Sequence, residues 1–292
     1  LTGSFIREGP VVLVKSSNGR VDVDDDPDPA VLYDGPLMVL TSRFSASASE
    51  ILAAALQDYG RALIVGDSTT HGKGTVQQVT EINKLLNTTN NLGAVKVTIR
   101  KFYRASGGST QLEGVTPDIV LPSINNEMKV GEASLENPLP WDRIESAKFE
   151  KLNRVKPWLD TLKTLSQKRV DADRDFNYLR GEIERYKKLR DEKTVAMNED
   201  LRRKEKADNK ARVEARKKEL IARGDPPGKV YEIKLSDALK EGLPAPVSRT
   251  NKTHAATGKP GSSTAEGDPA TAEKRPKSSS GDDADGDDDL DR

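Results

Sequence analysis

The sequence predicts an α/β domain with a mixed sheet, followed by a mainly α-helical region and a disordered tail. Up to about residue 123, short β-branched runs separated by Gly/Pro turns are typical of strands around a core. From about 145 to 223 the chain is charged and has apolar side chains at helical spacing. Beyond about 244 it is rich in Pro, Ser, Thr, Gly and Asp and has little to bury. We therefore expect three regions, 1–125, 126–243 and 244–292.

The first region reads as strands with one inserted helix. The expected elements are a strand over 11–15, a turn over 17–19, an acidic loop over 24–29, a strand over 37–40, a helix over 47–59, and strands over 62–65 and 95–103. Gly60 is expected to end the helix. A strand, a helix and a strand at this spacing favour a parallel βαβ unit. The last strand alternates with period two, which predicts an antiparallel, half-exposed position.

The helical region begins after Leu139–Asp142, LPWD, which we interpret as an anchor between domains. Apolar residues from Phe176 to Leu189 then repeat at spacings of three and four. The pattern predicts one helix that continues to about Ala222, because Gly224 and the following prolines stop it.

Composition excludes several kinds of site. The chain has 47 basic and 47 acidic residues and no cysteine, so disulfides, cysteine nucleophiles and thiolate metal sites are excluded. With only His71 and His254, a multi-histidine metal centre is not expected. Charge is segregated: residues 180–223 hold 16 basic and 10 acidic side chains, and 281–292 hold seven aspartates. The apolar runs are too short to span a bilayer.

Three serines, Ser45, Ser47 and Ser49, alternate with alanines directly before the predicted helix. Ser47 and Glu50 fit a capping box, in which hydroxyl and carboxylate each cover a free backbone amide. The same geometry suits a nucleophile, because a serine at a strand-to-helix turn lies beside free amides that can bind an oxyanion. The pattern has the logic of a nucleophile elbow, although Gly-x-Ser-x-Gly is absent. Both interpretations stay open on the residues alone.

Lys73 lies between two glycines in the stretch TTHGKGTVQQ, residues 69–78. The stretch is not a P-loop, because Gly74 stands where that motif has serine or threonine. A desolvated neutral lysine can act as a general base, and Ser-Lys catalysis is a known variant of the triad. The flanking glycines would let the backbone pack tightly around it. A phosphate-binding or solvent-facing lysine is the alternative.

Together the two motifs resemble those of the C-terminal processing peptidases, also called tail-specific proteases. The resemblance rests on RFSASASEILAAALQDYGRALIVGD and HGKGTVQQ, and extends to GPVVLVKSSNG, KFYRASGGSTQLEGVTPDIVLPS and LPWD. It covers residues 1 to about 145 closely. The helical region is more loosely similar to the C-terminal domain of the larger, tail-specific subgroup. The resemblance implies a ClpP/crotonase-like peptidase core.

The resemblance also implies roles for single residues. Ser47 would be the nucleophile and Lys73 the general base, with Gln77 orienting the lysine. Ser45 and Ser49 would then pack or cap.

Further residues would support this pair. The backbone amide of Ala48 would form half of the oxyanion hole, and Glu50 and Thr70 would lie near the site. The turn GDSTTHGKG is one residue longer than the GEPTFGKG type of the family, and His71 replaces an aromatic residue.

Asp58 matches an aspartate that the family has offered as a third catalytic member. Eleven residues of helix from Ser47 span roughly 16 Å, at about 1.5 Å per residue, so a direct role is excluded. We expect Asp58 to hold the end of the helix to a neighbouring loop.

The implied activity is that of a serine endopeptidase without cofactor or metal. Its substrates would be proteins with unfolded, apolar C-termini, cleaved in processing, quality control or signal transduction. The resemblance implies a periplasmic location, or a membrane-associated one facing the periplasm, and an adaptor lipoprotein as a candidate partner. It also places a glycine-rich NGGG-type segment and a PDZ domain before Leu1, so we expect the chain to be a fragment.

Two other functions fit part of the sequence. A non-catalytic scaffold of the same fold could use the basic stretch to bind an anionic partner. However, that stretch lacks interleaved aromatics, which is typical of a solvated helix, so no nucleic acid is expected. A crotonase-like enzyme acting on a thioester is the third possibility, and no residue pattern favours coenzyme A.

Overall fold

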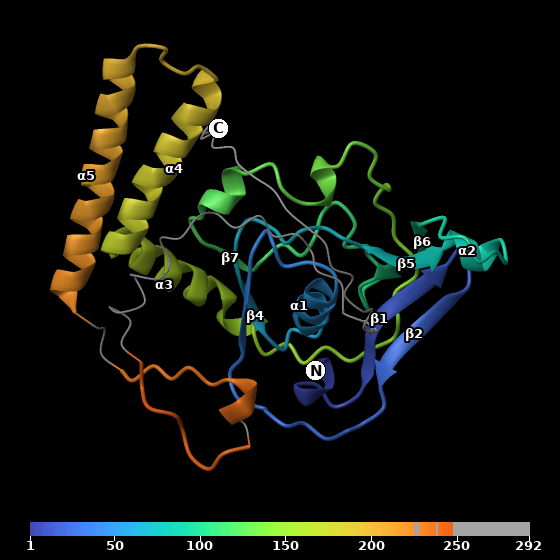
Figure 1. Ribbon diagram of the computed structural model, residues 1–292. Helices are drawn as coiled ribbons and strands as arrows, with labels where there is room; N and C mark the ends of the chain where they lie inside the picture. The colour runs from blue at the N-terminus through green and yellow to red at the C-terminus, as the bar shows by residue number, and fades with distance from the viewer. Residues whose placement is uncertain (225–227, 238, 248–292) are drawn as a thin grey trace. The chain divides into compact units, whose positions relative to one another are not determined.

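The computed structural model describes residues 1–224, 228–237 and 239–247. Contacts divide the chain into two units, Leu1–Thr194 and Val195–Arg292. The first unit contains the described strands and most of the helices (Figure 1). The predicted disordered tail lies outside the described residues except for 244–247. The division into 1–125, 126–243 and 244–292 stays a prediction.

The strands of the first unit form two sheets. One has four strands in the order β2-β1-β6-β5 and is antiparallel throughout; the other has three strands in the order β3-β4-β7 and is parallel. The sequence predicted one mixed sheet, whereas the structure has the parallel strand pairs in one sheet and the antiparallel pairs in another. The strands are β1 (Gly9–Ser16), β2 (Val21–Asp26), β3 (Met38–Thr41), β4 (Leu63–Gly66), β5 (Thr75–Glu81), β6 (Ala94–Tyr103) and β7 (Ile119–Val120).

Helix α1 lies near the centre of the first unit (Figure 1). The α-helices are α1 (Ala48–Asp58), α2 (Ile82–Leu85), α3 (Leu159–Ala172), α4 (Arg174–Glu192) and, in the second unit, α5 (Glu199–Arg223). Short 3₁₀ helices are η1 (Thr2–Ser4), η2 (Ile124–Glu127), η3 (Glu132–Ser134), η4 (Lys156–Trp158) and η5 (Leu235–Asp237).

Several predicted elements are confirmed. Strands lie near each predicted range, α1 ends beside Gly60, and β3 and β4 pair in parallel, as the βαβ pattern indicated. The long strand β6 pairs antiparallel with both β1 and β5.

Two expectations were wrong, and one strand was missed. The loop predicted over 24–29 overlaps the end of β2, because aspartates alternate with valines over 21–24 and the strand pairs with β1 in a hairpin. The strand β5 was not predicted, since its glutamines and threonines blur the apolar alternation. The single long helix is broken: α4 ends before Lys193, whose φ is 47°, and Asn198 caps the new helix α5 by accepting from the Leu201 amide at 3.0 Å.

Helix α1 packs against both sheets. Ala53 and Leu56 are fully buried in a cluster with Ile64 of β4, and Ile51 packs against the cluster that contains Val12 of β1. Burying one large aliphatic side chain contributes about 1.5–3 kcal/mol. This packing fixes the start of α1 relative to the loops that leave β3 and β4.

The second unit contains the basic helix α5. Arg203 pairs with Glu199 at 2.6 Å, and Arg223 pairs with Glu219 at 2.5 Å. In each pair the two partners lie one helical turn apart. Exposed pairs of this kind contribute little stability, but they offset part of the positive charge. The arrangement fits a solvated helix. No described helix is long and apolar enough to cross a bilayer.

Candidate active site

Ser47 occupies a strained turn between β3 and α1. It is the N-cap of α1, with φ 57° and ψ −113°. An N-cap residue ordinarily has an extended backbone, and a positive φ is uncommon for any residue with a Cβ. Such conformations persist only where surrounding contacts hold them, and they cluster at active sites. The sharp turn is the geometry that a nucleophile elbow needs.

The other two serines use their hydroxyls locally. Ser45 Oγ accepts from the Ser42 amide at 3.1 Å, and Ser49 Oγ donates to the Ala46 carbonyl at 2.9 Å. Both therefore have the packing or capping contacts expected of them. Ser47 is half-buried and is the serine at the strained position.

Glu50 joins the serine turn to the lysine loop. Its side chain is fully buried and accepts four hydrogen bonds. The donors are the amide of Ser47 at 2.8 Å, the hydroxyl of Thr70 at 2.6 Å, and the amides of Gly72 at 2.7 Å and Lys73 at 3.0 Å. The predicted capping box is present, but its carboxylate also binds a loop that begins twenty residues later. One buried group thus sets the backbone of both proposed reactive residues.

The glycines beside Lys73 are required by packing. Gly72 has φ +89°, and a Cβ there would lie 2.9 Å from the backbone of Leu112. A Cβ on Gly74 would lie 2.7 Å from the Gln111 amide nitrogen. The expectation of tight backbone packing is confirmed. Lys73 itself is half-buried, and its ammonium has no hydrogen bond or ion pair to any described residue.

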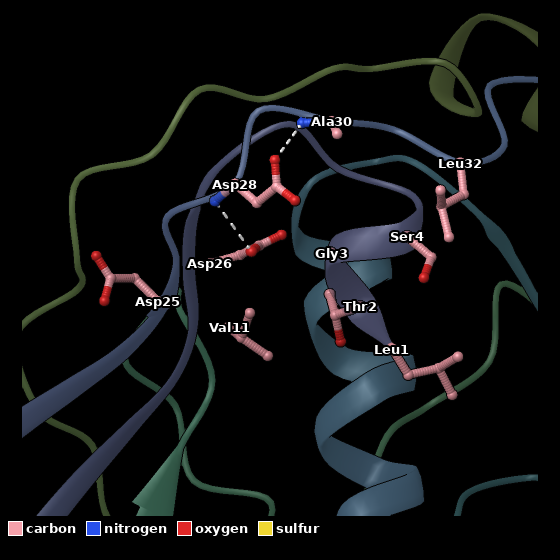
Figure 2. Close-up of a pocket in the computed structure, with 10 residues that line it drawn as sticks. All are labelled: Leu1, Thr2, Gly3, Ser4, Val11, Asp25, Asp26, Asp28, Ala30 and Leu32. Atoms are coloured by element: carbon pink, nitrogen blue, oxygen red, sulfur yellow. Dashed lines mark hydrogen bonds between the residues drawn. The ribbon is translucent and has the colours of Figure 1, made fainter.

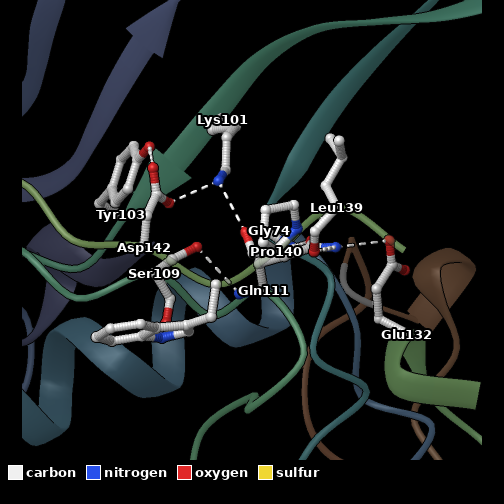
Figure 3. A network of polar contacts seen from close by, with 10 residues as sticks. Gly74, Lys101, Tyr103, Ser109, Gln111, Glu132, Leu139, Pro140 and Asp142 are labelled. Atoms are coloured by element: carbon white, nitrogen blue, oxygen red, sulfur yellow. Dashed lines mark hydrogen bonds and ion pairs between the residues drawn. The ribbon is translucent and has the colours of Figure 1, made fainter. Parts of the chain in front are cut away.

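A buried glutamine that was not among the predicted site residues, Gln111, binds Gly74 of the lysine loop (Figure 3). Gln111 Oε1 accepts from the Gly74 amide at 2.9 Å, and its Nε2 donates to Glu132 Oε1 and to the Leu139 carbonyl, both at 3.1 Å. Gln111 is fully buried. It lies in an irregular loop, so no periodicity could have singled it out.

The LPWD linker is anchored on the same network. The indole of Trp141 donates to the Ser109 carbonyl at 2.9 Å, and Asp142 binds Lys101 at 2.6 Å and the Tyr103 hydroxyl at 3.0 Å (Figure 3). Burial, and then the hydrogen bond to Asp142, raises the pKa of Tyr103 well above its usual range. These contacts hold the linker to β6 and the loop after it, and its role as an anchor between domains stays a prediction.

Asp58 lies at the other end of α1. It accepts from Arg104 at 2.6 Å, and from the amide and hydroxyl of Ser106 at 3.2 and 2.9 Å. These contacts confirm that it holds the end of the helix to a neighbouring loop. They involve none of the proposed reactive groups.

Two predicted residues have fewer contacts. Gln77 lies on β5, next to a bulge between Val76 and Gln77, and its exposed side chain has no hydrogen bond within the described chain. The structure therefore does not join Gln77 to Lys73. The amide of Ala48 also has no acceptor among the described residues. A free amide at a helix start is available to an incoming oxyanion.

One cavity of the first unit lies away from these residues. Figure 2 shows this cavity, of about 450 Å³, beside η1 and the end of β2. Asp26 and Asp28 contribute to its wall, and no predicted site residue does. No group of three or more described acidic or histidine side chains could hold a metal ion. The candidate site is therefore defined by its hydrogen bonds.

Comparisons with known proteins bear on these residues. Residues 1–121 match the model of peptidase family S41, and residues 125–276 match that of the C-terminal domain of tail specific protease. A tail-specific protease from Haemophilus influenzae is 39% identical over 82% of this chain and 35% of its own length. A carboxy-terminal-processing protease from Bartonella bacilliformis is 39% identical over 41% of this chain and 26% of its own.

A solved structure titled photosystem II D1 C-terminal processing protease is 34% identical over 41% of this chain and 29% of that one, with a TM-score of 0.35. That score is too low for the two folds to be compared in detail. The chain spans about a third or less of the length of the curated relatives it matches.

Proposed function

The chain belongs to the tail-specific proteases of peptidase family S41, and on that premise we propose that it carries the Ser47/Lys73 pair of a serine endopeptidase. The observation that supports this most strongly is Glu50, whose single carboxylate accepts the amides of both residues. A buried group with that reach holds the nucleophile loop and the base loop in one geometry.

In the proposed reaction, Ser47 Oγ attacks the scissile carbonyl carbon while neutral Lys73 Nζ takes its proton. The negative charge that develops on the carbonyl oxygen is stabilised by the Ala48 amide. Lys73 then gives the proton to the leaving amine, and the acyl group stays on Ser47. Water, deprotonated by the same lysine, attacks the acyl carbon, the ester bond to Ser47 breaks to release the acid product, and the lysine returns the proton to Ser47 Oγ.

Two features of Lys73 support its role as the base. None of the described carboxylates forms an ion pair with its Nζ, which leaves that nitrogen available to the Ser47 hydroxyl. The glycine on each side lets the loop pack against Leu112 and Gln111, which partly buries the side chain. Gln77, on the strand that follows the lysine loop, is proposed to orient the lysine once substrate is bound.

The proposed substrates are proteins with unfolded, apolar C-termini. This specificity, a periplasmic location and an adaptor lipoprotein as partner follow from the family resemblance. They concern the whole protein, of which this chain corresponds to the part that carries the serine and the lysine.

The test uses the full-length protein that contains these residues and an unfolded substrate ending in apolar residues. Ser47→Ala and Lys73→Ala are each expected to lower kcat by at least about a thousandfold, with the melting temperature unchanged. Ser45→Ala and Ser49→Ala are the matched controls and should keep cleaving. If all variants cleave alike, the proposal is wrong. If none cleaves, the parent included, a non-catalytic scaffold replaces it.

A further inference from the structure

Among the described residues, nothing pairs with the two outer strands of the antiparallel sheet, and these two edges differ in character. One edge is β2, whose six residues include four aspartates. The other edge is β5, which has no charged residue from Thr75 to Thr80. Exposed edges present unpaired N–H and C=O groups that recruit other strands, and proteins ordinarily protect them with charge or proline. The β2 edge is protected in this way, and the β5 edge is not.

The β5 edge is accessible along its length. Val79 is 65% exposed and Val76 is 37% exposed, and Gln77 and Gln78 are also exposed. Apart from the ladder to β6, the backbone of β5 has no hydrogen bond to any described residue. The bulge between Val76 and Gln77 leaves a regular, uncharged stretch from Gln77 to Thr80.

The position of this edge in the chain connects it with the proposed site. β5 begins two residues after Lys73, and the Gly74 carbonyl already accepts from the Phe102 amide of β6. The strand therefore runs directly away from the proposed base. A chain paired with β5 would be led to Lys73 by the sheet itself.

We propose that the free edge of β5 binds the substrate as an added β-strand, antiparallel to β5. The sheet is antiparallel throughout, so a strand that continues its pattern runs towards Lys73. The residues that pair are then those just N-terminal to the scissile bond. Main-chain hydrogen bonds give affinity without reading sequence, and the exposed Val76 and Val79, three positions apart, offer apolar contact on opposite faces of the strand. This inference rests on the proposed peptidase function.

The first test removes donors from the substrate. A peptide that the full-length protein cleaves is N-methylated, one position at a time, along the five residues before the scissile bond. In an antiparallel pair only alternate residues donate to the neighbour. We expect kcat/KM to fall about tenfold at alternate positions and to change little at those between them. A uniform response, or none, overturns the inference while leaving the peptidase proposal intact.

The second test changes the edge. Adjacent residues of a strand point their N–H groups in opposite directions, and proline removes the N–H group. Of Gln78→Pro and Val79→Pro, one variant therefore loses a bond to β6, whereas the other loses only an N–H group at the free edge. The second variant is expected to retain the parent's melting temperature. That variant should raise KM about tenfold with kcat unchanged. On β2, whichever of Val23→Pro and Asp24→Pro keeps the ladder to β1 and the parent's melting temperature is the matched control, and its KM should be unchanged. An unchanged KM in the folded β5 variant overturns the inference.

Two further outcomes would also overturn the inference. If light scattering shows a parent dimer that the folded β5 variant converts to a monomer, with KM unchanged, the edge joins two copies and does not bind substrate. If the parent does not cleave, or Ser47→Ala cleaves equally well, the peptidase proposal fails and this inference fails with it.

Discussion

The two ends of helix α1 each carry a buried carboxylate, and the two carboxylates have different partners. Glu50, at the start, accepts from three backbone amides and a hydroxyl, and has no cation beside it among the described residues. Asp58, at the end, accepts from the guanidinium of Arg104 and from Ser106. The first therefore positions backbone in two loops, whereas the second balances a charge. An acidic residue near a candidate site is best interpreted from what it binds.

The largest effect is expected from Glu50→Gln. The glutamine amide keeps the shape of the carboxylate but has only one acceptor oxygen for four donors. Each buried N–H group left without an acceptor destabilises the fold by about 1–3 kcal/mol. We expect kcat to fall by about a hundredfold or more, and the free energy of unfolding to fall by about 2–4 kcal/mol. Urea unfolding and steady-state kinetics measure both. Glu113→Gln, at an exposed position, is the control. If Glu50→Gln folds and keeps the parental kcat, Glu50 does not position the site, and the proposed difference between Glu50 and Asp58 is wrong.

A smaller effect, confined to stability, is expected from Asp58→Asn. Breaking the pair leaves Arg104 without a carboxylate, although it still donates to Gln57, and both side chains keep some exposure, 8% for Asp58 and 19% for Arg104. Allowing for solvent screening, the cost should be about 1–2 kcal/mol. The kcat of the folded fraction should stay within about twofold of the parent. The double variant Asp58→Asn/Arg104→Gln should lose less than the sum of the single variants. A fall in kcat without loss of stability would give Asp58 a catalytic role.

The smallest effect is a pH dependence next to Asp58. Burial, with the charges of Asp26 and Asp58, raises the pKa of Tyr59 to about 12, against about 10 unfolded. Between these values the folded chain keeps a proton that the unfolded chain loses, so this contribution is full below about pH 10 and is lost as pH rises towards 12. In urea titrations from pH 9 to 11.5, Tyr59→Phe should show a shallower decline than the parent. Equal slopes would contradict this cause.

Local patterns predicted local structure well. The Ser47/Glu50 spacing predicted the cap of α1, the alternation over 95–103 predicted an antiparallel strand, and Gly60 predicted the end of the helix. These features depend on neighbours a few residues away. The break at Lys193 was missed because α4 and α5 have the same charged composition on either side of it.

The site was predicted less completely, because its contacts are distant in sequence. The second role of Glu50 depends on Thr70 and Gly72, and that of Gln111 on Gly74 and Leu139. No pattern of spacing encodes such pairs. The strained φ of Ser47 likewise appears only once the turn is built. The roles of Ser47, Lys73 and Gln77 come from the family resemblance and stay predictions.

The central claim is that Ser47 is made nucleophilic by Lys73. The most direct measurement treats the full-length protein with a peptidyl fluorophosphonate, which reacts with an activated serine hydroxyl, and locates the adduct by mass spectrometry of the digested chain. The account predicts one adduct, on Ser47, forming at least about a hundredfold more slowly in Lys73→Ala. An adduct on Ser45 or Ser49, or equal rates in parent and Lys73→Ala, would contradict it.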